Sequence, residues 1–342
     1  MKTERLSINE IEKAGELIRR GELVAFPTET VYGLGANALN EEAVRSIYVA
    51  KGRPSDNPMI VHISSPFRLP ELIRDGKDGI GRDALVLIEA FWPGPLTLIF
   101  LKSAAVPDVT TGGLDTVAIR MPSNGTALEL IDAAGCPIAA PSANLSGKPS
   151  PTTAEDVLED MDGRIAAVLM GEQSMVGIES TVVDLTGDVP TVLRPGRITA
   201  EDLSQVLGKE VRYDSSLYTK PTEIADPEDG VAETEKAPKS PGMKYRHYSP
   251  NAKVRLIAGN DEEFTAQAVK LGAEARKNGQ RTAILNYGDN PGKAAYKLFA
   301  DLRELDRQHY DQIFIRSLEE VGYGFSVMNR MLKSAGYDIV KE

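Results

Sequence analysis

The sequence is poor in the side chains that build disulfides and metal centres. Its 342 residues include one cysteine, Cys136, and three histidines, His62, His247 and His309. A lone cysteine excludes an internal disulfide and a cysteine-rich metal site, and the histidines lack the spacing of a zinc motif such as H-E-x-x-H. A chain of this length without disulfides is typical of a reducing cytosol. We therefore expect a cytoplasmic protein that builds no metal site from its own side chains.

Long apolar runs and excess positive charge are also missing. No run of 18 apolar residues occurs, and the first residues, MKTERL, have no apolar signal core, so we expect neither a membrane span nor export. The formal net charge is −11, which opposes non-specific binding to nucleic acid or to an anionic membrane. Any polyanion must therefore be held at a local basic site.

The first 210 residues alternate short apolar runs with helical patterns, which predicts an α/β domain around one mixed sheet. A capping box at residues 7–10 opens the first helix, which we expect to stop near Gly21. Further helices are expected at 41–50, 83–91, 126–134, 154–161 and 200–207. Strands are expected at 23–26, 60–63, 96–101, 117–121, 137–140, 165–170, 181–185 and 192–194.

A linker is expected at residues 211–252. Residues 223–235 carry six acids and no base, so they cannot bury a core. Residues 236–253 carry five Lys or Arg residues and no acid, and they include the segment SPGMKYRHYSP at 240–250. This basic stretch is either a counterpart to its acidic neighbour or a lid over an anionic ligand.

Residues 253–342 repeat a strand–helix alternation. We expect strands at 254–257, 281–285 and 312–315 and helices at 264–275, 292–305 and 326–335. This order predicts a small parallel-sheet domain of Rossmann-like topology. The domain has no G-x-G-x-x-G, so the sequence does not support nucleotide binding there.

Two polar clusters, KGRPSDNP at 51–58 and PSAN at 141–144, have the chemistry of a polyphosphate site without a Walker loop. A lysine point charge, an arginine fork and the donors of Ser and Asn suit phosphate oxygens. Exposed Lys and Arg at a helix end often only complement the helix dipole, but two prolines in five residues hold a defined loop shape. A nucleotide enzyme is the leading hypothesis.

Other motifs leave alternatives open. PTETVYGLG at 27–35 follows an expected strand, and its hydroxyls either contact a substrate or satisfy a turn. Arg120 lies among apolar residues, so it needs an anionic partner, which is either a bound carboxylate or an internal Asp or Glu. His62, in the middle of an expected strand, is by itself more often a structural residue than a ligand contact.

The chain contains, in order, the segments PTETVYGLG, KGRPSDNP, WPGPLT, IRMP, APSANLSG, ESTVVD, LRPGR and SPGMKYRHYSP. In these segments it resembles the YrdC-like threonylcarbamoyl-AMP synthase family in its longer form. The resemblance implies a twisted, mixed, open sheet with helices at 1–210, the linker, and the small Rossmann-like domain at 253–342. It also implies a nucleotidyltransferase that joins L-threonine, bicarbonate or CO2, and ATP, and releases pyrophosphate. The product would serve threonylcarbamoyladenosine formation at position 37 of tRNA.

The resemblance also implies site residues. ATP contacts are expected from Lys51, Arg53, Asn57, Thr116, Ser142, Asn144, Ser150, Arg194 and Tyr245. L-Threonine contacts are expected from Thr30, His62, Arg120, Ala140 and Ser180. We expect Lys51 and Arg53 to be the catalytic pair that stabilises the developing phosphoryl charge, with Mg2+ entering as a cofactor on ATP.

Two other functions compete with this one. An RNA-binding module would use the same basic loops, but the charge of −11 opposes it. A carbamoyltransferase that handles carbamoyl-adenylate, as in hydrogenase maturation, would carry acylphosphatase and zinc-finger elements that this sequence lacks. The expected partners are the downstream tRNA threonylcarbamoyl transferase machinery, with at most weak RNA binding and no membrane.

Overall fold

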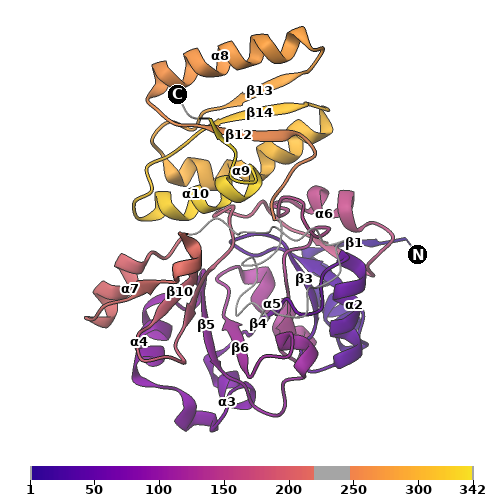
Figure 1. Ribbon diagram of the computed structural model, residues 1–342. Coiled ribbons are helices and arrows are strands. Elements are labelled where there is room, and N and C mark those ends of the chain that lie inside the picture. Colours follow the sequence, from indigo (N-terminus) through magenta and orange to yellow (C-terminus); the bar gives the residue numbers. More distant parts are fainter. Residues whose placement is uncertain (1, 219–246, 341–342) are drawn as a thin grey trace.

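The structure, a computed structural model, describes residues 2–218 and 247–340, which form two α/β units stacked on each other (Figure 1). Tyr245 and most of the SPGMKYRHYSP segment lie outside the described residues. Within the described ranges no helix has the length and apolar character needed to cross a membrane.

The first unit is built on a mixed sheet of eleven strands in the described residues, in the order β1-β8-β2-β3-β7-β4-β6-β5-β9-β10-β11. The strands are β1 (Glu4–Ser7), β2 (Val24–Phe26), β3 (Gly33–Asn37), β4 (Ile60–His62), β5 (Leu96–Leu101), β6 (Thr116–Arg120), β7 (Ile138–Ala139), β8 (Ala167–Met170), β9 (Thr181–Asp184), β10 (Thr191–Arg194) and β11 (Arg212–Tyr213). Parallel pairs such as β4–β6 and β5–β9 alternate with antiparallel pairs such as β5–β6 and β2–β3.

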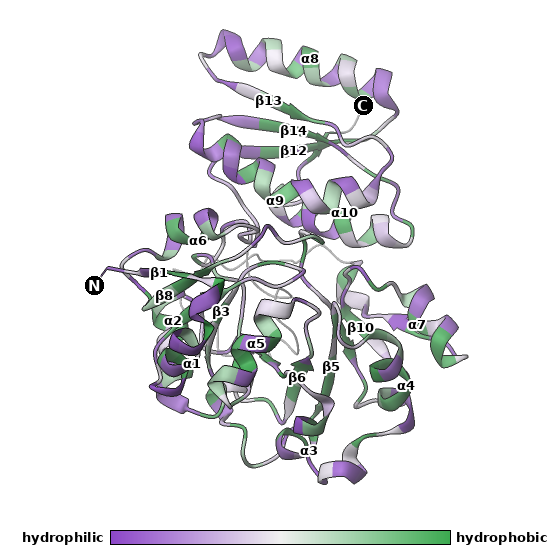
Figure 2. Ribbon diagram, turned by 180° about the vertical axis from the view of Figure 1, so that it is seen from behind, coloured by the Kyte–Doolittle hydropathy of each residue, from purple (hydrophilic) through white to green (hydrophobic). Residues whose placement is uncertain are grey.

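Helices cover both faces of this sheet. They are α1 (Ile11–Arg19), α2 (Glu41–Lys51), α3 (Leu69–Leu72), α4 (Arg82–Phe91), α5 (Gly125–Ala134), α6 (Ala154–Met161) and α7 (Ala200–Leu207). Side chains alternate along β2: Val24 and Phe26 pack with α1 and α5, whereas Ala25 joins the larger core with α2. Strand β5 is coloured hydrophobic along much of its length (Figure 2). Leu98 of β5 and Ile119 of β6 belong to the larger core, whereas Ile99 and Ala118 form a small cluster with residues of neighbouring strands.

The second unit is a four-stranded parallel sheet in the order β13-β14-β12-β15. Its elements are β12 (Lys253–Ile257), α8 (Asp261–Lys277), β13 (Thr282–Leu285), α9 (Pro291–Arg307), β14 (Gln312–Arg316), α10 (Tyr323–Ser334) and β15 (Ile339–Val340). Helix α8 covers the outer face, while α9 and α10 lie between the small sheet and the first unit (Figure 1). Val31 and Ile178 of the first unit belong to the same core as α9 and α10, so the apolar core is continuous across the boundary.

The fold class expected from the sequence is confirmed, but four short strands were not expected: β1, β3, β11 and β15. Strand β11 pairs with β10, so the sheet extends into residues 211–252, which we expected to be a linker. Residues 23–26 are not the first strand, because Glu4–Ser7 already pairs with β8. Residues 33–37, whose glycines suggested a turn, form β3 beside β2. A side chain at Gly35 would lie 2.9 Å from both the Phe26 ring and Ile138, so this glycine makes room for a close approach within the sheet.

Helix ends place the first polar cluster. Asn40 caps α2 by accepting from the backbone N–H groups of Glu42 and Ala43. The helix ends at Gly52, whose φ of 59° turns the chain into the left-handed region. This turn leaves Lys51 on the inner side of the helix and sends Arg53 into the following loop.

Candidate active site

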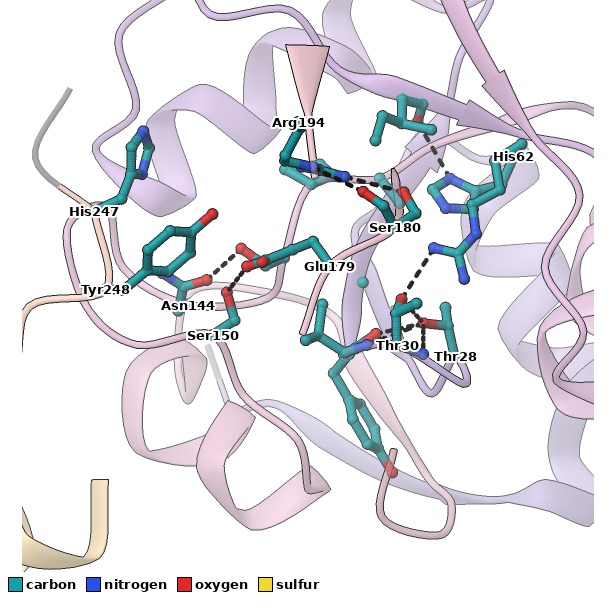
Figure 3. A pocket seen from close by; sticks show the side chains of 18 of the residues that line it. Thr28, Thr30, His62, Asn144, Ser150, Glu179, Ser180, Arg194, His247 and Tyr248 are labelled. Carbon is teal, nitrogen blue, oxygen red and sulfur yellow. Dashed lines mark hydrogen bonds between the residues drawn. The ribbon is translucent and has the colours of Figure 1, made fainter. Parts of the chain in front are cut away.

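One pocket, at the ends of inner strands of the large sheet such as β4, β6 and β10, gathers most of the predicted site residues (Figure 3). The empty space inside it, open solvent at the mouth included, is about 650 Å³. It is lined by Thr28, Thr30, Val31, Tyr32, Gly33, Arg53, Ile60, His62, Arg120, Ala140, Pro141, Ser142, Asn144, Lys148, Ser150, Glu179, Ser180, Arg194, His247 and Tyr248.

The two polar clusters of the sequence converge through Lys51. Its Nζ donates to the backbone carbonyls of Ser142 and Asn144, each at 2.5 Å, and its own carbonyl accepts from the Ser146 N–H. Lys51 is 2% exposed, and burial, followed by the nearby Arg53, holds the pKa of its ammonium well below the usual value. The structure therefore places Lys51 beneath the loop that it shapes, and not in the pocket lining.

The loop tied down by Lys51 presents hydroxyl and amide groups. Ser142 Oγ donates to Asn144 Oδ1 at 2.5 Å, and Asn144 Nδ2 donates to the carbonyls of Leu145 and Lys148. Arg53 lines the same pocket and donates to the carbonyls of Asn57 and Pro58. The side chains of Arg53, Ser142 and Asn144 thus share one concavity, as the sequence predicted.

The opposite wall contains an arginine held by three partners. Arg120, at the end of β6, donates to Thr30 Oγ1 at 3.0 Å and to the Gly94 carbonyl at 3.2 Å, and its Nη2 lies 2.7 Å from Glu29 Oε1. Arg120 and Glu29 are both about 4% exposed in their side chains, so each offsets the burial of the other's charge. The internal ion pair considered for Arg120 is therefore present, and Arg120 also lines the pocket.

Two histidines in the lining are neutral. His62 ends β4, its ring stands edge-on to Phe26, and its Nδ1 lies 3.2 Å from the Ile60 carbonyl. Burial, followed by Arg120, lowers the pKa of His62 to about 3. Burial likewise lowers the pKa of His247 to about 3. Both rings therefore act as neutral polar groups near pH 7.

A second buried arginine stands on the floor of the pocket. Arg194 donates from Nε to the Ser180 carbonyl and from Nη2 to Ser180 Oγ, both at 3.0 Å. Ser180 Oγ is in turn 2.8 Å from Thr97 Oγ1. Burial lowers the pKa of Arg194 to about 10, which leaves the guanidinium charged at neutral pH.

Glu179 is a lining residue that the sequence analysis did not assign, although its neighbour Ser180 was expected. Its carboxylate accepts from Ser150 Oγ at 2.6 Å (Figure 3) and from Arg330 Nε of α10 at 2.9 Å. Burial would raise the pKa of Glu179, but Arg330, Arg194 and these hydrogen bonds outweigh it and hold the pKa below its ordinary value. Arg330 is a contribution of the second unit that no motif indicated.

The lining carries four cationic side chains, Arg53, Arg120, Lys148 and Arg194, against one carboxylate, Glu179. This excess of positive charge favours an anionic ligand. Within residues 2–218 and 247–340 no group of three or more His, Cys, Asp or Glu side chains is arranged to hold a metal.

Ten of the residues expected from the sequence line the pocket: Thr30, Arg53, His62, Arg120, Ala140, Ser142, Asn144, Ser150, Ser180 and Arg194. Lys51 lies beneath the lining, and Asn57 and Thr116 lie outside it. Thr116 begins β6 whereas Arg120 ends it, so the pleated strand carries the two residues to opposite ends. Tyr245 is outside the described residues.

The fold and pocket define a two-unit α/β protein with a cationic small-molecule site. The Sua5_yciO_yrdC family, described as telomere recombination, matches residues 16–196, and the threonylcarbamoyl-AMP synthase C-terminal domain matches residues 198–336. Threonylcarbamoyl-AMP synthases of Pyrococcus abyssi and Bacillus subtilis are 45% and 42% identical, over 99% of this chain and 97% of each relative. The crystal structure of P. abyssi Sua5 complexed with L-threonine has a TM-score of 0.89 and 43% identity, and covers 100% of both chains.

The chain belongs to the threonylcarbamoyl-AMP synthase family, and it is an enzyme, as the sequence predicted.

Replacing Lys51 tests its structural role. Lys51→Met fills similar space but leaves the Ser142 and Asn144 carbonyls without their donor, at about 1–3 kcal/mol for each buried group. We expect the free energy of unfolding, measured in urea, to fall by about 2–4 kcal/mol. The control Lys13→Met removes an exposed ion pair and should change it by less than about 1 kcal/mol. Equal effects of the two substitutions would contradict a stabilising role for the buried hydrogen bonds of Lys51.

The neutral state of His62 predicts a pH dependence of stability. The unfolded chain binds a proton near pH 6.5, whereas the folded chain does so only near pH 3, so His62 stabilises the fold fully above pH 6.5 and less as the pH falls toward 3. In His62→Gln, the free energy of unfolding should fall less steeply between these limits, by up to about 1.4 kcal/mol per pH unit. An unchanged slope in His62→Gln would contradict the buried, neutral ring.

Proposed function

We propose that this enzyme uses the pocket to join L-threonine, bicarbonate or CO2, and ATP into threonylcarbamoyl-AMP, with release of pyrophosphate. Synthesis of threonylcarbamoyl-AMP is the activity named for the relatives that match the whole chain. The observation that carries the assignment of substrates to the pocket is its make-up: a set of cations and hydroxyls lies next to the buried Arg120–Thr30 pair. The related P. abyssi structure holds L-threonine, which supports threonine as the amino acid here.

The proposed chemistry needs no nucleophile from the enzyme. The threonine amine attacks the carbon of CO2, or the carbon of bicarbonate with a C–O bond breaking and the hydroxyl group leaving as water; an N–C bond forms, and the amine loses a proton. A carbamate oxygen then attacks the α-phosphorus of ATP, and pyrophosphate leaves as the bond between the α- and β-phosphates breaks. Holding the reactants in line can supply roughly 7–11 kcal/mol of the barrier.

The two walls of the pocket suit the two organic substrates. Arg120 would pair with the threonine carboxylate, and Thr30 and Ser180 would offer hydroxyls to its polar groups. Arg53, Ser142, Asn144, Ser150 and Arg194 would contact ATP. Lys51 would act through the shape of the Ser142–Asn144 loop, because its ammonium is already bonded to that loop.

Mg2+ is proposed to enter with ATP, where it would help to neutralise the charge of the phosphates. The residues present fit this role and not that of a resident metal site, because the one lining carboxylate, Glu179, is bonded to Ser150 and Arg330. The product would pass to a tRNA threonylcarbamoyl transferase. A cytoplasmic location is part of the proposal, since the lone cysteine suits a reducing compartment.

The proposal is tested by incubating the purified protein with ATP, Mg2+, labelled bicarbonate and each of threonine, serine and valine. Threonine should give pyrophosphate and the labelled adenylate. Valine should react poorly because it leaves buried polar groups unpaired, and serine should lose only the binding of one methyl group, about 1 kcal/mol. Steeply salt-dependent tRNA binding without any pyrophosphate release would favour the RNA-binding module instead.

Arg120 offers a test of the threonine wall. Arg120→Ala removes a charge-assisted contact of about 1.5–3 kcal/mol, so the Kd for threonine should rise by about 10-fold to 150-fold with little change for ATP. Isothermal titration measures both values. Arg45→Ala, on the exposed face of α2, is the control and should leave both Kd values unchanged. Loss of ATP affinity with normal threonine affinity would remove Arg120 from this role.

A further inference from the structure

Two buried arginines of the second unit converge on one loop of the pocket. Arg303 of α9 and Arg330 of α10 are 4% and 0% exposed. Arg303 bonds to the backbone of residue 149, and Arg330 bonds to the carboxylate that holds Ser150. The loop is the same one whose residues Asn144 and Ser150 line the pocket.

Arg303 fixes the course of the backbone. Its Nε and Nη2 both donate to the Pro149 carbonyl, at 3.1 and 2.7 Å, and Nη2 also donates to Asp160 at 2.8 Å. Asp160 accepts in turn from Lys148 Nζ at 2.9 Å and from the Leu145 N–H at 3.2 Å. The guanidinium and the buried carboxylate together hold both arms of the loop.

Arg330 both neutralises the charge of Glu179 and holds its side chain in position. It donates to Glu179 at 2.9 Å, and its guanidinium stands 5.7 Å from the ring centroid of Tyr248. Tyr248 lines the pocket and stacks on Phe299 of α9. The one carboxylate in the lining is therefore neutralised by a cation that comes from the other unit.

Glu179 needs the positive charge of Arg330 because its carboxylate is buried. An unpaired carboxylate at the position of Glu179, which is 7% exposed, would oppose any phosphate bound in the same pocket. Arg194 and Ser150 also face Glu179, but both lie on the pocket side and are needed for the ligand. Arg330 approaches from behind and does not line the pocket.

We propose that Arg330 is a positioning residue for the reaction: it holds Glu179 ionised but neutralised, so that Ser150 and the surrounding cations accept the triphosphate. The second unit thereby completes the nucleotide half of the pocket. This inference rests on the proposed function, because it takes ATP as the anionic ligand.

The first test is Arg330→Met. We expect the KM for ATP to rise by about tenfold or more, equivalent to ~1.4 kcal/mol, with a smaller change in the KM for threonine. Without Arg330, burial raises the pKa of Glu179, so protonation at lower pH should remove the repulsion. The ratio of the variant's KM for ATP to that of the wild type should therefore shrink as the pH is lowered. The other charged or titratable groups around Glu179 are unchanged in the variant: Arg194, His247, Tyr248 and Lys333.

The second test is rescue. In Glu179→Gln/Arg330→Met both charges are gone, so the KM for ATP should recover toward the value of Glu179→Gln alone. A merely structural role for Arg330 would leave the double variant as impaired as Arg330→Met, and that result would overturn the inference. The matched control is Arg316→Met, which removes another buried arginine of the second unit, paired to Asp261 and Asp289 away from the pocket. It should lower Tm without the pH-dependent change in KM.

The outcomes separate the inference from the proposed function. If the wild type makes no adenylate from ATP, the proposed function fails. If the wild type is active and Arg330→Met has the wild-type KM for ATP at every pH, only the inference fails. Should Arg330→Met not fold, the comparison of Glu179→Gln/Arg330→Met with Glu179→Gln still decides: equal KM values for ATP confirm charge neutralisation, and unequal values contradict it.

Discussion

The ammonium of Lys51 lies in the protein interior, where it can remain only because the carbonyls of Ser142 and Asn144 accept its hydrogens. These bonds join the end of α2 to a loop 91 and 93 residues further along the chain, so the two polar segments have a fixed relation. These two hydrogen bonds position the side chains of Arg53, Ser142 and Asn144 in the pocket. The charge costs free energy to bury, and its hydrogen bonds to the two carbonyls specify the backbone shape of this loop.

The same physics accounts for the boundary between the two units. Asp160 and Glu179 are buried carboxylates of the first unit, and their guanidinium partners, Arg303 and Arg330, belong to the second. Removing one partner of a buried pair leaves an uncompensated charge, which costs about 3–5 kcal/mol. The apolar core that includes Val31 and Ile178 adds burial across the same boundary. The second unit therefore packs against the residues that support the pocket, in addition to its connection through the linker.

Much of this arrangement could be predicted from local patterns, and the remainder depends on long-range contacts. Short continuous apolar runs located β4, β5 and β6 because both faces of these strands are buried, so successive side chains are apolar. The Arg53, Ser142 and Asn144 cluster was predictable because its chemistry is local to two short segments. Strand β3 was not predicted because the two glycines of GLGAN are typical of a turn. The need for glycine at position 35 comes from its contact with the Phe26 ring, which the local sequence does not show. No local signal in α10 distinguishes Arg330 from an ordinary surface arginine, since its partner, Glu179, is 151 residues away.

The protonation states of the lining restrict how the pocket can work. A general base or acid is most effective when its pKa lies near the working pH. Burial lowers the pKa values of His62 and His247 to about 3, and it raises the pKa of Tyr248 to about 12. Arg194, with a pKa of about 10, stays charged. These groups are fixed dipoles and charges near neutral pH and not proton carriers. In the proposed reaction the pocket would act by holding the reacting groups in line against charges that are in place before the substrates bind.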